Sequence, residues 1–141
     1  MEAPRGPAAN RDFVVVGTSP IGIPLIRVTA MPADTNPAGD IFGGWLMAHM
    51  DMAAGNAATR RSQGRCATVK VDEMVFLSPV LVGDEVSFYA AVHGVGQTSL
   101  TVCVEAWRRS RASDEVAKVT EATFTFVAIG ADRRPRPVPP P

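Results

Sequence analysis

The fold is decided around Asn36-Pro37-Ala38-Gly39-Asp40-Ile41-Phe42-Gly43-Gly44-Trp45-Leu46-Met47-Ala48, where a loop that contains proline turns into an apolar helix. Beyond this stretch, small and apolar side chains recur at helical spacing, which predicts a helix over residues 42–62. These side chains belong to Leu46, Met50, Ala53, Ala54 and Ala57. Because most of them are small, we expect the helix to pack closely on a flat surface and Gly64 to end it.

Four runs rich in Val, Thr and Phe follow the helix, and their alternating character is typical of β-strands. They cover residues 66–76, 85–95, 98–109 and 116–129. The turns between them are short, which favours antiparallel hairpins. A shorter strand, predicted over residues 23–29, has Pro24 near its start and suits a sheet edge. The simplest architecture is α+β, with an antiparallel sheet of about five strands wrapped around one long central helix.

Length and composition favour a single domain. The chain has 141 residues, of which 46% are hydrophobic, and this is enough for one core. Residues 1–20 are predicted to form a flexible N-terminal arm, residues 21–130 the single domain, and residues 131–141 a disordered tail rich in Pro and Arg. Basic and acidic residues both number 14, so no overall charge draws the chain to nucleic acid or to an acidic membrane.

The chain carries no signal-peptide pattern and no run of about 18 apolar residues, so we expect a cytoplasmic protein without a membrane span. Cys66 and Cys103 lack CxxC spacing and lie in alternating apolar runs, which favours buried reduced thiols over a disulfide. His49 and His93 are the only histidines. Since neither has further ligands at metal spacing, no metal site is expected.

Asp40 and the Gly43-Gly44 pair carry the chemistry that the sequence suggests. The first turn of a helix has N–H groups without intrahelical acceptors and a partial positive charge, so it attracts developing oxyanions. Two successive glycines let the carbonyl of another molecule approach those N–H groups. With a carboxylate just before them as general base or nucleophile, they could hydrolyse an acyl bond. The residue types fit equally well an Asp40 that only N-caps the helix.

A longer motif surrounds these residues: Met31-Pro32-x-Asp34-Thr35-Asn36-x-x-Gly39-Asp40-Ile41-Phe42-Gly43-Gly44-Trp45-x-Met47. It resembles that of the YciA-type acyl-CoA thioesterases of the hotdog-fold superfamily. The resemblance covers roughly residues 25–136. It continues through residues 65–71, Phe76-Leu77-x-Pro79-Val80-x-Val82-Gly83-Asp84, Thr98-Ser99, Val104-Glu105-x-Trp107 and Glu121-Ala122-x-Phe124.

The resemblance implies a hydrolase that cleaves the thioester of acyl-CoA into a free acid and CoA, with no cofactor and no metal. Asp40 matches the catalytic acid of the family, as general base or nucleophile. Gly43 and Gly44 match the helix N-terminus whose N–H groups receive the thioester oxygen. Enzymes of this kind form homodimers, often assembled further as trimers of dimers, and hold the acyl and CoA groups at the subunit interface.

Asp51 and Asn36 each have two interpretations. Some other hotdog thioesterases use an acidic residue on the central helix about two turns beyond the glycines, so Asp51 is a second catalytic or water-orienting candidate. A hydrogen bond to polar neighbours explains it as well. The Asn36 amide is expected either to orient Asp40 or substrate, or to satisfy the tight loop before Pro37.

Trp45, Met47, Thr98 and Ser99 are candidates for substrate binding. Trp45 and Met47 could line an acyl tunnel, since flexible methionine adapts to different chain lengths, but core packing explains them equally well. Thr98 and Ser99 could bind water or CoA across an interface, or form local hydrogen bonds at the strand start. Where the family often has a basic residue this chain has Ser78, which puts a CoA-phosphate contact there in doubt.

Two other functions share this fold. A non-catalytic acyl-CoA-binding or regulatory module would need Asp40 only as a helix cap. A dehydratase acting on a CoA or carrier-protein thioester would usually need a histidine aligned with the acid, and neither His49 nor His93 lies in the active loop. The sequence does not decide the acyl-chain length, because pocket depth depends on how two subunits pack.

Overall fold

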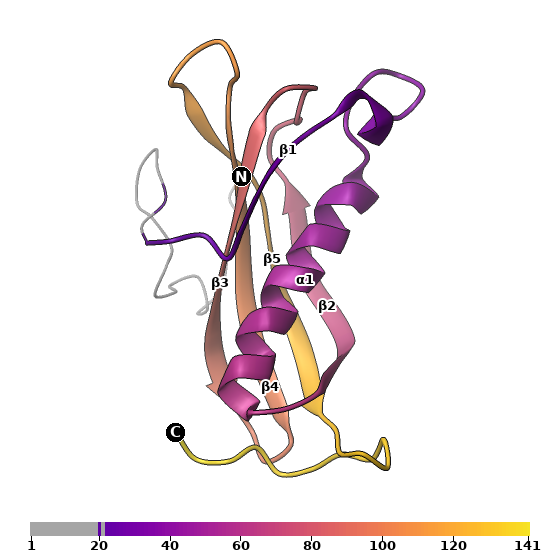
Figure 1. Cartoon of the computed structure of the whole chain (residues 1–141), viewed down its shortest axis with the longest axis vertical. Helices are drawn as coiled ribbons and strands as arrows, with labels where there is room; N and C mark the ends of the chain where they lie inside the picture. The colour runs from indigo at the N-terminus through magenta and orange to yellow at the C-terminus, as the bar shows by residue number, and fades with distance from the viewer. Residues whose placement is uncertain (1–19, 21) are drawn as a thin grey trace.

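The described part of the chain forms one five-stranded antiparallel sheet that wraps around a single long helix (Figure 1). The structure is a computed structural model and describes residue 20 and residues 22–141. The predicted arm, residues 1–20, lies outside that range except for Pro20. In chain order the elements are β1 (Ile26–Thr29), the 3-10 helix η2 (Pro32–Asp34), α1 (Gly43–Ser62), β2 (Cys66–Phe76), β3 (Glu85–Val95), β4 (Ser99–Arg109) and β5 (Val116–Ala128).

The strands lie in the order β1-β3-β4-β5-β2, so β1 and β2 form the two edges of the sheet. The predicted architecture is confirmed, and the bounds predicted for α1 and the four long strands differ from the observed ones by at most one residue. Strand β1 is shorter than predicted, because Pro24 has no N–H to donate to the ladder. The chain joins β3 only after it, where the Leu25 N–H donates to the Phe88 carbonyl at 2.8 Å.

Helix α1 lies along one face of the sheet and buries its small side chains there. Ala53, Ala54 and Ala58 are fully buried, so the helix backbone approaches the sheet closely, as the sequence predicts. The buried facing side chains come from β3, β4 and β5, and include Val86, Phe88, Leu100, Val102, Val104, Phe124 and Phe126, while β2 adds the partly buried Val71 and Met74. This packing fixes where each end of the helix lies.

Both cysteines are reduced thiols and not half of a disulfide, as predicted. Cys103 is buried on the other face of the sheet, in a small cluster with Tyr89 and Trp107. Cys66 is only half-buried, and its Sγ lies 3.0 Å from the Ser62 hydroxyl at the end of α1. The prediction of burial therefore holds fully for one thiol and partly for the other.

The C-terminal tail, predicted from composition to be disordered, makes defined contacts with the domain in the structure. Arg136 holds the tail against the end of α1 and the start of β2. Its Nε donates to the Ile129 carbonyl at 3.0 Å and its Nη1 to the Ser62 carbonyl at 3.0 Å. Its Nη2 donates to the Arg65 carbonyl at 3.3 Å. Farther along, the Val138 N–H donates to the Gln97 carbonyl at 2.9 Å, and its side chain packs on the core. Composition favoured disorder because prolines cannot form ladders, but a guanidinium can bind three carbonyls at once.

Candidate active site

The loop before α1 is organised by Asn36. Its side-chain Oδ1 accepts hydrogen bonds from the N–H groups of Ala38 and Asp40, at 2.9 and 3.1 Å. Its backbone N–H donates to the Asp40 carbonyl at 2.7 Å. Gly39 closes the turn with φ +94°, a conformation that residues with a Cβ rarely adopt. Of the two interpretations of Asn36, the structure therefore supports the loop role, and through this loop Asn36 fixes the Asp40 backbone.

Asp40 does not cap α1. The N-cap is Phe42, and no side chain forms a hydrogen bond to cap the helix. The interpretation in which Asp40 only caps the helix is therefore wrong for this chain. The Asp40 side chain is exposed and makes no hydrogen bond or ion pair with any described residue, so its carboxylate is available to another molecule.

The first turn of α1 presents free backbone donors. Within the described residues, the N–H groups of Gly43 and Gly44 have no acceptor. A Cβ built on Gly44 would have no atom within 4 Å, and one on Gly43 would lie 3.5 Å from the Phe76 ring. An incoming carbonyl can therefore reach both donors, at the end of the helix where the partial charge is positive.

Asp40 and Gly43 border a hollow of about 460 Å³, which we call the Asp40 hollow. Asn36, Asp40 and Gly43 lie on one side, and the end of β2 with the turn after it lies on the other. The residues on that second side are Phe76, Leu77, Ser78, Pro79 and Val80. Phe76 and Leu77 are apolar yet 51% and 53% exposed. Sequence reasoning missed these two residues because an alternating strand does not reveal which apolar side chain at its end stays uncovered.

Asp51 is not part of the Asp40 hollow. It lies eight residues beyond Gly43, about 12 Å farther along the helix. Its Oδ1 accepts a hydrogen bond of 2.6 Å from the Thr68 hydroxyl on β2. The structure thus gives Asp51 the polar neighbour that a structural role requires, and within one chain it does not bring the two carboxylates together.

The predicted substrate-binding residues also lie outside the Asp40 hollow of their own chain. Trp45 packs beside the rings of His49 and Phe88, at centroid distances of 4.4 and 6.4 Å. Met47 is exposed on the helix surface. Thr98 and Ser99 lie at the turn between β3 and β4, near the C-terminal end of α1, where the Thr98 carbonyl accepts from the Ala128 N–H at 2.8 Å. None of the four lines the Asp40 hollow.

A carboxylate in the middle of the sheet is fully buried but lies outside the site. Glu105 on β4 is 1% exposed, and burial raises the pKa of its carboxyl group, although the Trp107 indole N–H and the Lys118 ammonium act in the opposite direction. The Trp107 Nε1 donates to Glu105 Oε1 at 2.9 Å, and Lys118 Nζ lies 3.1 Å from Oε2. These partners explain how a charge is tolerated in the sheet, and we assign Glu105 no catalytic role.

Two features are absent from the described range, which is residue 20 and residues 22–141. No three His, Cys, Asp or Glu side chains in that range gather as a metal site would require. No helix there is long and apolar enough to cross a membrane.

Comparison with known proteins agrees with this geometry. Residues 38–114 match the model of the thioesterase superfamily. The chain is 46% identical over 130 residues to the acyl-CoA thioester hydrolase YciA of Salmonella typhimurium, which covers 90% of this chain and 98% of that protein. The chain belongs to the YciA-type thioesterases.

Solved structures of YciA-type and related thioesterases share the fold. One is a hexameric broad-specificity acyl-coenzyme A thioesterase, with a TM-score of 0.82 and 43% identity over 88% of this chain and 86% of that one. Its structure has also been determined with one aspartate replaced by alanine. Another is a hexameric hotdog-fold thioesterase of Campylobacter jejuni, with a TM-score of 0.80 and 40% identity over 84% of this chain and 91% of that one.

Proposed function

We propose that this YciA-type thioesterase hydrolyses acyl-CoA to a free carboxylic acid and CoA. One observation carries the proposal: the exposed Asp40 carboxylate borders the same hollow as Gly43, at a helix N-terminus where the N–H groups of Gly43 and Gly44, like that carboxylate, have no partner among the described residues. This is the equipment that acyl transfer needs, in a chain whose relatives carry that activity in their names.

In the proposed mechanism the thioester oxygen accepts hydrogen bonds from Gly43 and Gly44, which stabilise the negative charge that develops on it. Asp40 acts as general base, removing a proton from water while the water oxygen adds to the carbonyl carbon. The carbon–sulfur bond then breaks, and the CoA sulfur takes up the proton. Alternatively, an Asp40 carboxylate oxygen attacks the carbonyl carbon, the carbon–sulfur bond breaks and CoA leaves as a thiolate that takes up a proton; water then hydrolyses the resulting anhydride to the free acid and the Asp40 carboxylate.

The roles of the other candidates follow from their positions. Asn36 holds the Asp40 backbone and is a positioning residue. Phe76 and Leu77, exposed beside Gly43, offer the acyl chain an apolar surface. Trp45, Met47, Thr98, Ser99 and Asp51 lie away from the Asp40 hollow of their own chain, so we propose that any contact they make with substrate involves the site of a partner subunit.

We further propose a homohexamer built as a trimer of dimers. Related structures are hexameric, and β2 is an edge strand with half-exposed apolar residues, among them Val69, Val75 and Phe76. Light scattering should give a mass about six times the 14.9 kDa of the chain. The cytoplasmic location and the absence of a resident cofactor also remain proposals.

The decisive test compares wild type with Asp40→Asn on a panel of short to long acyl-CoAs, with release of free thiol as the readout. We expect Asp40→Asn to lose roughly 10²- to 10⁴-fold in kcat, the range for a general base, while binding CoA and keeping the wild-type circular dichroism. Asp51→Asn is the matched carboxylate control and should retain most activity. Hydrolysis retained by Asp40→Asn would move the chemistry elsewhere, and wild type that binds CoA without turnover would indicate a binding module.

A further inference from the structure

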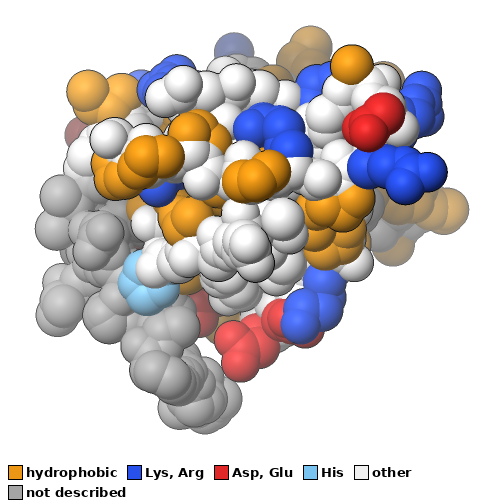
Figure 2. Space-filling view, turned by 90° about the horizontal axis from the view of Figure 1, so that it is seen from below, with side chains coloured by type: hydrophobic (Ala, Val, Ile, Leu, Met, Phe, Trp, Pro, Cys, Tyr) orange, Lys and Arg blue, Asp and Glu red, His pale blue; other side chains and the backbone are white. Residues whose placement is uncertain are grey.

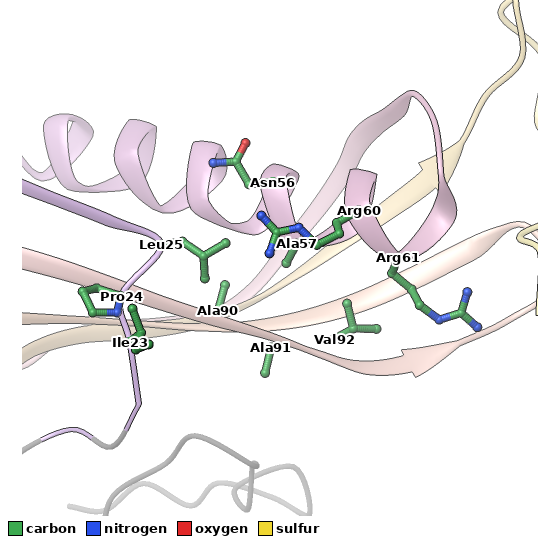
Figure 3. Close-up of a pocket in the computed structure, with 10 residues that line it drawn as sticks. All are labelled: Ile23, Pro24, Leu25, Asn56, Ala57, Arg60, Arg61, Ala90, Ala91 and Val92. Carbon is green, nitrogen blue, oxygen red and sulfur yellow. The ribbon is translucent and has the colours of Figure 1, made fainter. Parts of the chain in front are cut away.

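A groove runs along α1 on the side away from the β2 edge, in the C-terminal half of the helix (Figure 3). It consists of two adjoining hollows, of about 590 and 660 Å³, that share Asn56 and Arg60. One wall is formed by residues 23–26. The other is a single stripe of the helix at intervals of three and four residues, formed by Met52, Gly55, Asn56, Thr59 and Arg60. We call this the Arg60 groove, and the volume of each of its two hollows is within the range of small-molecule sites.

The Arg60 groove exists because β1 stops short. Pairing between β1 and β3 ends at Phe88, and in the described part of the chain no strand lies beside the rest of the β3 edge. Ala90 and Val92 point from that bare part of β3 toward α1, whereas Ala91 points to the other face (Figure 3). Because Ala90 is small and Pro24 keeps β1 away, the side chains of Ala90 and Val92 stay partly uncovered. They form the apolar floor of the groove.

Arg60 supplies the charge at this groove. Its guanidinium runs back along α1 toward the Asn56 amide, whereas the Arg61 side chain points away (Figure 3) and donates to the Pro139 carbonyl at 2.7 Å. Arg60 makes no hydrogen bond or ion pair with any described residue, and the described residues that line the two hollows include no Asp or Glu. A view from this end of the molecule shows Lys and Arg side chains with apolar side chains between them (Figure 2).

We propose that the Arg60 groove binds a long-chain carboxylate, with its alkyl chain on the apolar floor and its carboxylate on Arg60 and Asn56. A guanidinium forms paired hydrogen bonds with a carboxylate, and the Asn56 amide adds a donor beside it. Burial of the alkyl chain makes binding depend on chain length. The acid released from a long-chain acyl-CoA would belong to this class. That link rests on the proposed function, whereas binding in the groove does not.

The test uses dodecanoate and measures binding by calorimetry on the full-length chain carrying Asp40→Asn. We expect Arg60→Gln to weaken binding at least tenfold. Arg134→Gln, which removes an equal charge from an exposed side chain with no described hydrogen bond or ion pair, should leave binding unchanged. Ala57→Leu places a larger side chain in the groove and should also weaken binding, and dodecanol should bind weakly with no effect of Arg60→Gln.

A photoreactive dodecanoate carrying a diazirine locates the site. We expect cross-links in residues 23–26, 52–60 or 90–92. Cross-links confined to residues 36–47 and 76–80 would place the acid in the Asp40 hollow and overturn the proposal, as would equal binding by wild type and Arg60→Gln. Loss of the wild-type oligomeric mass in Ala57→Leu would instead make the groove an interface between copies. Hydrolysis of acetyl-CoA by Arg60→Gln, without Asp40→Asn, should match wild type, which separates this proposal from the proposed function.

Discussion

At the N-terminal end of α1 the N–H groups of Gly43 and Gly44 have no acceptor among the described residues, whereas at the C-terminal end the backbone is covered. There the Ser62 carbonyl accepts from Arg136, and the Thr59 carbonyl accepts from the Gly64 N–H at 3.3 Å. Every helix leaves unpaired donors at one end and unpaired acceptors at the other. In α1, carbonyl acceptors at the C-terminal end are paired within the chain. At the N-terminal end, which faces the Asp40 hollow, the first N–H donors have no partner among the described residues.

The two ends also differ in where their partners lie in the sequence. The open end is built locally, since residues 36–44 contain the loop, the carboxylate and the glycines. The covered end depends on Arg136, which lies 74 residues beyond Ser62. A local feature can be seen in a sequence motif, but a contact over that separation requires the fold.

The largest expected effect comes from removing a donor at the open end. Gly43→Pro deletes one N–H at the first helical position, where proline is tolerated, and Phe42 before it already has the extended conformation that proline requires, with ψ 138°. If Gly43 supplies the oxyanion hole, kcat should fall roughly 10²- to 10³-fold. Gly43→Ala keeps the N–H, and its Cβ would meet the Phe76 ring at an ordinary 3.5 Å, so its kcat should stay within several-fold of wild type.

Equal activity of the Pro and Ala variants would assign the donor role to Gly44 alone. Circular dichroism and oligomeric mass should be unchanged in both. A Pro variant that loses its fold would not report on the donor, so the comparison is made only at matched mass and helix content.

The second largest effect is expected from removing the hydrogen bonds of Arg136 at the covered, C-terminal end of α1. Arg136→Ala leaves the Ser62, Ile129 and Arg65 carbonyls without this donor and should lower the free energy of unfolding by about 2–3 kcal/mol, as expected for hydrogen bonds from a charged group. Urea unfolding at a fixed protomer concentration measures it. The kcat of the folded variant should remain close to that of wild type, because Asp40 and the glycines are at the other end.

Arg134→Ala is the matched control, since the Arg134 side chain is exposed and its change should stay within about 0.5 kcal/mol. Equal stability of Arg136→Ala and Arg134→Ala would mean that the tail does not hold the helix end. A large loss of kcat in Arg136→Ala would mean that the two ends of α1 are coupled.

Most of the fold follows from local pattern. Alternation placed β2 to β5, small residues placed α1, and Pro24 explains why β1 is short. The contacts of the tail could not be predicted, because proline content describes what a segment cannot pair with and says nothing of a guanidinium that reaches back 74 residues. In the same way, Gly64 was expected to end the helix through its own conformation, yet the left-handed residue is Gln63, with φ 59°.

The part of the site that is formed by neighbouring residues could be predicted from the sequence. Asp40, Gly43 and Gly44 lie within five residues, so a single loop and helix turn bring them together. Phe76 and Leu77 reach the Asp40 hollow from the far end of β2, and only the sheet topology shows this. Thr98 and Ser99 lie near the opposite end of α1, so their proposed role depends on a second subunit, which a single sequence does not place.

The smallest expected effect concerns the left-handed residue at which α1 ends. Gln63 adopts the left-handed conformation that ends α1, a conformation in which a Cβ is unfavourable and which glycine adopts freely. Gln63→Gly should therefore raise the free energy of unfolding by about 0.5–1 kcal/mol in spite of glycine's greater freedom in the unfolded chain. Gln63→Ala keeps the Cβ and should give no gain. Gly64→Ala should destabilise the protein, because a Cβ on Gly64 would lie 2.5 Å from Arg136 Nη2 and would displace the guanidinium. If Gln63→Gly destabilised as well, the Gln63 side chain would be contributing to the cover that Arg136 provides, and the covered end of α1 would depend on more than the tail.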